Sequence, residues 1–162
     1  MNAMENYLNI LHFCFYRAHY KSHLWANKIN PFRLIHKLPF QKRQYKKLGI
    51  DINKEVDRAF GDKKFGLSTM VAGGILWGMI GIFFFSLIIV FNLIEYANMS
   101  HIIGCSLFSG VLCYFFVFKN DKYVKHFDSY EQWSKMEKRQ YCLLTMASIV
   151  AIFFLFYLGL TT

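Results

Sequence analysis

The sequence predicts an all-α polytopic membrane protein with three transmembrane helices and a basic, helical, cytoplasmic N-terminal segment. Three observations lead to this fold class. The 162-residue chain is 55% hydrophobic and 19% aromatic, which is more apolar than an average soluble domain. Residues 65–118 contain a single charged residue, Glu95, and residues 141–162 contain none. The net charge is nevertheless +9, and every Lys and Arg residue lies outside those two stretches.

Residues 1–64 form the first predicted domain, a basic amphipathic segment. It holds 13 of the 19 Lys and Arg residues, and Leu8, Leu11 and Phe15 recur in it at helical spacing. Aromatic residues mixed with basic ones are typical of helices that lie in the membrane interface, and a small folded cytoplasmic cap fits the same pattern. Anionic lipid headgroups are the expected partners of six basic residues: Arg33, Lys37, Lys42, Arg43, Lys46 and Lys47.

Residues 65–162 form the second predicted domain, a bundle of three transmembrane helices. Hydrocarbon does not solvate charge, so a charge-free apolar run of about 20 residues predicts a spanning helix. Three runs meet this criterion, at residues 67–93, 100–118 and 141–160. The first would reach about 40 Å as a helix, so we expect it to tilt or to extend past one surface. The short connection around Glu95 makes the first two runs an antiparallel hairpin.

Small residues lie one helical turn apart in all three runs. Gly74 and Gly78 form a G-x-x-x-G pattern in the first. Small residues let helix backbones approach closely, and packing rather than hydrophobicity drives helix association in lipid. The pattern predicts a helix contact, either with another span of the same chain or with another subunit. The residues predicted to make such contacts are Gly74, Gly78, Ser106, Gly110, Ala147 and Ala151.

The distribution of basic residues predicts the orientation of the chain. Lys and Arg residues that flank transmembrane helices tend to stay on the cytoplasmic side. The 6 Lys and Arg residues outside the first domain all lie in the loop 119–140. We therefore expect residues 1–64 and 119–140 to be cytoplasmic and the C-terminus to lie outside. Topology and lipid contact thus account for the positive charge, and we expect no nucleic acid as a partner.

The predicted spans lack the residues that membrane enzymes and transporters need. Such proteins place ionisable groups inside the bundle. Here Asn92, Glu95 and His101 all lie within about one turn of a span end, where water reaches them. The four cysteines form no C-x-x-C pair, which argues against a metal or redox site. The sequence therefore predicts no catalytic residue, no cofactor and no metal site, and a protein that is not an enzyme.

The loop 119–140 is predicted to contain two short helices. Aromatic residues recur in it at helical spacing, with charged residues between them. Asp128 with Glu131, and Ser134 with Glu137, have the spacing of capping boxes, which mark helix starts. One helix should continue the second span into the cytoplasm, and the other should lead into the third span.

Four short motifs occur together in this chain: Phe15-Tyr16-Arg17, the run 114–119, Lys122-Tyr123, and the run 138–141 before an aliphatic span. In this combination the sequence resembles a group of short three-span bacterial membrane proteins of unknown function. The resemblance to bacterial membrane proteins implies a location in the bacterial inner membrane. Some members of that group lie beside toxin genes, which suggests an immunity role. Residues 21–64 fall outside the resemblance, which carries over no catalytic residue.

These observations predict a non-enzymatic small integral membrane protein. We expect a membrane-complex subunit or partner-binding protein that works through helix contacts and a basic cytoplasmic face. Its partner would be a second copy in a homo-oligomer or another membrane subunit. Two alternatives remain, namely an immunity protein that binds a membrane-targeted toxin and an oligomeric defence effector that permeabilises the membrane.

Overall fold

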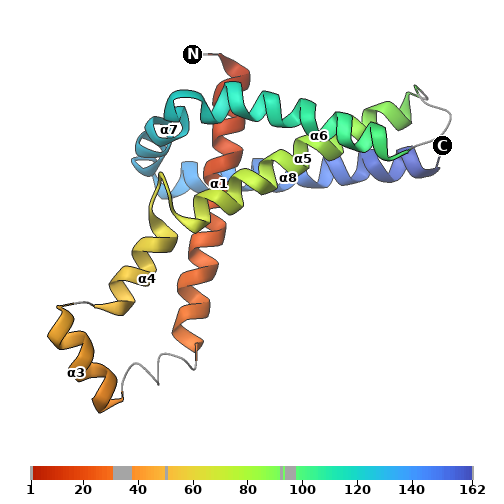
Figure 1. Cartoon of the computed structure of the whole chain (residues 1–162). Coiled ribbons are helices and arrows are strands. Elements are labelled where there is room, and N and C mark those ends of the chain that lie inside the picture. Colours follow the sequence, from red (N-terminus) through yellow and green to blue (C-terminus); the bar gives the residue numbers. More distant parts are fainter. Residues whose placement is uncertain (1, 31–37, 50, 92, 94–97, 162) are drawn as a thin grey trace. The chain divides into compact units, whose positions relative to one another are not determined.

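The computed structural model describes residues 2–30, 38–49, 51–91, 93 and 98–161. Within these ranges the chain is all-α, as predicted (Figure 1). The predicted residues Arg33, Lys37, Asn92 and Glu95 lie outside them. The elements, in chain order, are α1 (Ala3–Ile29), α3 (Pro39–Leu48), α4 (Ile52–Gly61), α5 (Leu67–Val90), α6 (Met99–Cys113), the π-helix η1 (Tyr114–Phe118), the 3₁₀ turn η2 (Lys119–Asp121), α7 (Lys122–Glu131) and α8 (Lys135–Thr161).

Three helical stretches are long and apolar enough to cross a membrane, which confirms the three predicted spans. They are Leu67–Val90, Met99–Glu131 and Lys135–Thr161. The third begins six residues before the predicted boundary at 141, and a capping box explains this early start. The backbone N–H of Ser134 donates to Glu137 Oε2 (2.7 Å), and the N–H of Glu137 donates to Ser134 Oγ (3.2 Å). The other predicted capping box is wrong, because Asp128 lies inside α7.

Contacts group the chain into two compact units. Met1–Phe15 and Ala72–Thr162 form the first unit, and Tyr16–Val71 forms the second. Two continuous helices, α1 and α5, therefore contribute residues to both units. The division of the chain at residue 64 stays a prediction.

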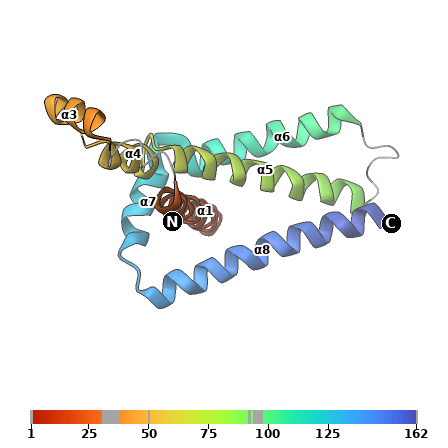
Figure 2. The same ribbon diagram turned by 90° about the horizontal axis from the view of Figure 1, so that it is seen from below.

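In the first unit, the N-terminal half of α1 is buried against the long helices. It runs across α5, α6 and α8 (Figure 1), and Figure 2 shows it end-on between α5 and α8. Leu8, Ile10 and Leu11 are buried, as expected for an apolar helix face. Asn9 and His12 are completely buried as well, at 0% exposure each. Protein therefore surrounds this part of α1, and its buried polar residues need partners within the fold.

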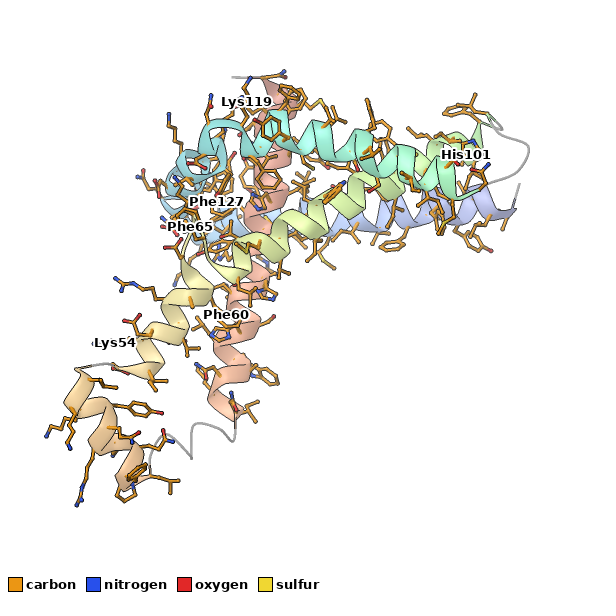
Figure 3. All side chains as sticks on the ribbon, viewed as in Figure 1. Lys54, Phe60, Phe65, His101, Lys119 and Phe127 are labelled. Carbon is orange, nitrogen blue, oxygen red and sulfur yellow. The ribbon has the colours of Figure 1, made fainter. Side chains whose placement is uncertain are left out.

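An aromatic cluster joins α1 to α7. Phe127 of α7 is completely buried, and its ring centre lies 5.1 Å from that of His12 and 5.3 Å from that of Phe13 (Figure 3). Trp133 stacks between the rings of Tyr130 and Tyr141, with both centroid distances at 4.2 Å. Aromatic pairs at these separations add stability beyond the area that they bury. The cluster accounts for the aromatic spacing in the loop 119–140.

The chain changes direction between α6 and α7 over a few residues. α6 continues into the π-helix η1, and η2 then contains two residues with positive φ, Asn120 at 60° and Asp121 at 52°. Asn and Asp tolerate this region better than other non-glycine residues. The reversal lets Tyr123 and Phe127 of α7 reach His12 of α1, with ring centroids 5.4 Å and 5.1 Å away.

In the second unit, α4 packs on the C-terminal half of α1. The rings of His23 and Phe60 stack with centroids 3.6 Å apart (Phe60 is labelled in Figure 3). Asp57 Oδ1 accepts a hydrogen bond from Asn27 Nδ2 (3.1 Å) and lies 3.4 Å from His23 Nε2. Tyr16 donates its hydroxyl proton to the carbonyl of Gly61 (2.8 Å). By contrast, no residue of α3 is buried.

Candidate functional site

A groove of about 430 Å³ runs between α5 and α6 in the first unit. Its lining combines small residues with aromatic ones, among them Gly74, Trp77, Gly78, Gly81, Ser106 and Ser109. Both helices belong to stretches that could cross a membrane. We call this feature the glycine groove, since glycines form one side of it.

The glycines of the groove have different neighbours. A Cβ atom added at Gly74 or Gly78 would meet nothing within 4 Å. A Cβ atom at Gly81 would lie 3.4 Å from Ser109 Oγ, and one at Gly110 would lie 3.3 Å from the ring of Trp77. Contact between α5 and α6 therefore occurs at Gly81 and Gly110. Gly74 and Gly78, the predicted G-x-x-x-G pair, face the open space of the groove instead.

The polar groups of the groove are hydrogen-bonded to one another. Trp77 Nε1 donates to the carbonyl of Ser106 (2.7 Å), and Ser109 Oγ donates to the same carbonyl (2.9 Å). Hydrocarbon offers no water to replace such partners, so these bonds remove the cost of exposing the donors there. The groove thus presents small and mostly apolar surface, and two of its polar donors are already bonded within it.

The six predicted contact residues do not form one continuous face. Gly74, Gly78 and Ser106 line the glycine groove, and Gly110 lies against Trp77 at its side. Ala147 and Ala151 of α8 line a separate pocket of about 540 Å³ together with α1 and α5. Spacing along a helix identifies small faces, but it does not show which neighbour each face meets.

The predicted headgroup-binding residues that the structure describes all belong to α3. Lys42, Arg43, Lys46 and Lys47 lie on this ten-residue helix, which contains no acidic residue. Phe40 and Leu48 of the same helix are 69% and 67% exposed. A helix that exposes basic and large apolar side chains together has the composition of an interfacial membrane helix.

A polar cluster between α1 and α7 was not predicted from the sequence. Lys122 Nζ donates to Glu5 Oε2 (2.8 Å), and His126 Nε2 lies 3.6 Å from Glu5 Oε1. The Tyr130 hydroxyl donates to Asn6 Oδ1 (2.7 Å) and lies 3.1 Å from His126 Nδ1. The hydrogen bond from Lys122 holds the pKa of Glu5 below its ordinary value. The cluster fixes α1 to α7. A signal for it was that Glu5 is the only charged residue among the first 16.

His101 forms a capping box with Asn98 at the start of α6 (His101 is labelled in Figure 3). Among the described ranges, no group of three or more His, Cys, Asp or Glu residues is arranged to hold a metal ion. Cys105 and Cys113 are buried thiols, and Cys142 is an exposed one.

Comparison of the chain with protein-family models, with curated proteins and with solved structures found no match. The resemblance to three-span bacterial membrane proteins, the immunity role and the homo-oligomer therefore stay predictions from the sequence.

Proposed function

We propose that this protein is a non-enzymatic subunit of a membrane complex and that its glycine groove receives a transmembrane helix of a partner subunit. One observation carries the proposal, namely that Gly74 and Gly78 face a groove in which nothing lies within 4 Å of an added Cβ atom. A helix backbone approaches most closely where side chains are absent, and close packing is what drives helix association in lipid.

The chemistry of the groove favours a helix over a polar ligand. Its Trp77 and Ser109 donors are both directed to the Ser106 carbonyl, so they offer no free proton to a polar guest. An incoming helix has satisfied its own backbone groups and needs only shape complementarity. The groove is lined by α5 and α6, with Phe156 of α8 at one point, and all three helices belong to stretches of membrane-spanning length. A partner helix of similar length can therefore pack along it.

The basic helix α3 supports a second part of the proposal, that the protein holds anionic lipid headgroups next to the complex. Each Lys or Arg near an anionic surface contributes about 1 kcal/mol. The four basic residues of α3 lie beside the exposed Phe40 and Leu48, so charge and apolar contact act on the same surface.

The groove is tested by measuring the mass of the purified complex in mild detergent. Gly78→Leu places a branched side chain in the groove, whereas Gly104→Leu adds the same side chain on α6 at a position that also has nothing within 4 Å and lies outside the groove. We expect the wild type and Gly104→Leu to carry a partner and Gly78→Leu to lose it. A measured mass that is a multiple of 19.2 kDa identifies the partner as a second copy, and any other added protein mass identifies a different subunit.

Two results would overturn the proposal. One is a wild-type protein that runs as a monomer in several mild detergents and in lipid nanodiscs. The other is a complex that Gly78→Leu and Gly104→Leu affect equally. The contribution of α3 is read separately from a fluorescent label at Gln44→Cys in a background that also carries Cys14→Ser and Cys142→Ser, which removes the two native thiols that are not buried. Its emission should shift to the blue in vesicles with phosphatidylglycerol but not in neutral vesicles, and no shift in either would refute headgroup binding by α3.

A further inference from the structure

A second pocket, of about 540 Å³, lies within the first unit between the N-terminal half of α1, α5 and α8. Leu8 and Leu11 line it from α1, Ile80 and Phe83 from α5, and Ala147 and Ala151 from α8. We call it the wedge pocket. None of its lining residues belongs to the glycine groove.

The pocket exists because α5 and α8 approach each other near their C-terminal ends and diverge toward α1 (Figure 2). At the C-terminal ends, a Cβ atom at Gly159 would lie 3.2 Å from Ile89 of α5, and the rings of Phe85 and Phe156 lie 6.4 Å apart. At the other end, α1 lies between the two helices (Figure 2). The small side chains of Ala147 and Ala151 leave the space beside α1 unfilled.

The lining is apolar apart from one hydrogen-bonded pair. Ser148 Oγ donates to the carbonyl of Leu144 (2.8 Å), which leaves the Tyr7 hydroxyl as the donor in its 2.6 Å contact with Ser148 Oγ. Both hydroxyl protons are therefore in use. A polar ligand would find no donor in this pair, and a water molecule needs two to four polar partners.

The size of the pocket points to a chain-like hydrocarbon guest. An apolar cavity of about 150 Å³ is enough to bind benzene, and this pocket is more than three times larger. An apolar void that stays empty forfeits the dispersion contacts of its lining. Filling it with hydrocarbon restores those contacts without desolvating any polar group.

The exposure of the pocket to the bilayer indicates that a membrane lipid supplies this hydrocarbon chain. The pocket is only partly enclosed, and three of the four helices that line it, namely α5, α6 through Leu112, and α8, belong to stretches of membrane-spanning length. Met4 and Tyr7 of α1 and Leu144 of α8 line the pocket and are themselves exposed, at 43%, 38% and 44%. In a bilayer this surface is covered by acyl chains, and the pocket continues it inward. We propose that the wedge pocket binds one acyl chain of a membrane glycerophospholipid, held between α1, α5 and α8.

The proposal rests on the membrane location of the three long helices and is independent of the glycine groove. It also assigns a role to the N-terminal half of α1. Its apolar side chains Leu8 and Leu11 line the inner wall of the pocket, while Asn9 and His12 do not line it and are buried by protein. The acyl chain thus packs against the side of α1 that the small side chains of α8 leave uncovered.

Native mass spectrometry of the full chain, after delipidation and addition of a phosphatidylglycerol or phosphatidylethanolamine with C16 and C18 chains, tests the proposal. Ala151→Phe fills the pocket, and Val150→Phe places the same ring on the exposed side of α8 as a matched control. We expect one lipid on the wild type and on Val150→Phe with either headgroup. Ala151→Phe should bind roughly tenfold more weakly, a factor that the displacement of a few methylene groups is enough to produce.

Equal lipid binding by the wild type and both Phe variants, or no bound lipid on the wild type, would overturn the proposal. A protein mass in place of a lipid would assign the pocket to a partner helix and would overturn it as well. If Ala151→Phe does not elute as a single species, Ala147→Val is the substitute, since it narrows the same pocket by less. Gly78→Leu should keep its lipid, so the failure of one site is distinguishable from the failure of the other.

Discussion

Asn9 of α1 donates its side-chain amide to the carbonyl of Phe116, 107 residues away, over 3.1 Å. The same amide group donates to the carbonyl of Glu5 (2.7 Å), so Asn9 ties its own helix to the end of the α6–η1 stretch. The helical geometry breaks at Asn120, which has φ of 60°, and Phe116 therefore lies in a last turn. Carbonyls in the last turn lose their intrahelical partners, and Asn9 supplies a donor from a distant helix.

Replacing Asn9 with Leu should lower the stability of the first unit. Leu has a similar size but no donor, so the Phe116 carbonyl would lose this part-buried hydrogen bond. Leu also removes Asn9 Oδ1, a buried acceptor without a hydrogen-bond partner, so the net cost should be about 1 kcal/mol. Denaturant unfolding in detergent measures the effect. Gln140→Leu, a polar-to-apolar change at an exposed position, is the control and should be close to neutral. Equal losses in both variants would mean that the Asn9 bond contributes nothing specific.

The membrane-length helices could be predicted from the sequence because charge exclusion is a local property of the chain. The helix start before the third span followed from Ser134 and Glu137, two residues that also lie close together in the sequence. The bond between Asn9 and Phe116 could not be predicted, since it depends on how η1 and η2 redirect the chain. A polar residue between Leu8 and Ile10 in an apolar helix start was the available signal that Asn9 has a buried partner.

The candidate sites also combine features that a local sequence pattern predicts with contacts that depend on the fold. Glycine spacing predicted a close-approach surface, and Gly74 and Gly78 do form one side of a groove. The rotation of α5 about its axis decides which glycine touches α6, and no local pattern encodes that rotation. Gly81 and Gly110 make the contact inside the chain, while Gly74 and Gly78 remain open.

Lowering the pH should weaken the link between α1 and α7. The pKa of Glu5 lies below its ordinary value of 4.5, because Lys122 donates a hydrogen bond to the carboxylate. Because the pKa is lowered, the ionised Glu5 carboxylate stabilises the folded protein fully above about pH 4.5. This stabilisation is lost as the pH falls through the pKa of Glu5 in the folded state. The contribution itself should be at most about 1 kcal/mol, as for most pairs with solvent access.

The comparison of wild type with Glu5→Gln measures this contribution. The Tm of the wild type should exceed that of Glu5→Gln at pH 7, and this difference should vanish as the pH approaches 3. Glu55→Gln removes a carboxylate from an exposed pair with Arg58 on α4 and serves as the matched control. A pH-independent difference for Glu5→Gln would show that the carboxylate charge is not what stabilises the contact.

Two adjacent glycines of α5 should respond oppositely to alanine. A Cβ atom at Gly73 would lie 2.9 Å from Phe118 Cζ, whereas one at Gly74 would meet nothing within 4 Å. Alanine is intrinsically better in a helix than glycine by up to about 1 kcal/mol, and that gain is the same at both sites. At Gly73 only, overpacking against Phe118 should outweigh this gain, so that Gly73→Ala lowers stability by about 1–3 kcal/mol. Thermal unfolding of the two variants side by side decides the matter, and equal shifts would contradict the Gly73–Phe118 contact.

The charge distribution makes a prediction about topology. A reporter enzyme that is active only outside the cytoplasm should be active when it is fused to the C-terminus, because three spans separate this end from the basic N-terminal segment. A second fusion in the loop 119–140 should report the cytoplasm. A cytoplasmic signal from both fusions would refute the predicted orientation.

The turn that precedes α5 should depend strictly on Gly66 and only weakly on the charge of Asp62. A Cβ atom at Gly66 would lie 2.2 Å from the carbonyl oxygen of Asp62, which cannot move away because it accepts hydrogen bonds from Gly66 N (3.0 Å) and Thr69 Oγ1 (3.0 Å). Asp62 Oδ1 accepts from the backbone N–H groups of Lys64 (2.8 Å) and Phe65 (2.6 Å), and these bonds lower the pKa of the Asp62 carboxyl group.

Gly66→Ala should therefore open this turn at a cost of about 3 kcal/mol, in the range of severe backbone effects. Asp62→Asn keeps an oxygen acceptor and should cost about 1 kcal/mol or less. Limited trypsin digestion reads the turn directly, since Lys63 and Lys64 lie within it. Cleavage there should accelerate strongly for Gly66→Ala and only slightly for Asp62→Asn. Gly104→Ala, at an open position, should cleave as the wild type does, and the same rate for Gly66→Ala would show that the turn tolerates a Cβ atom.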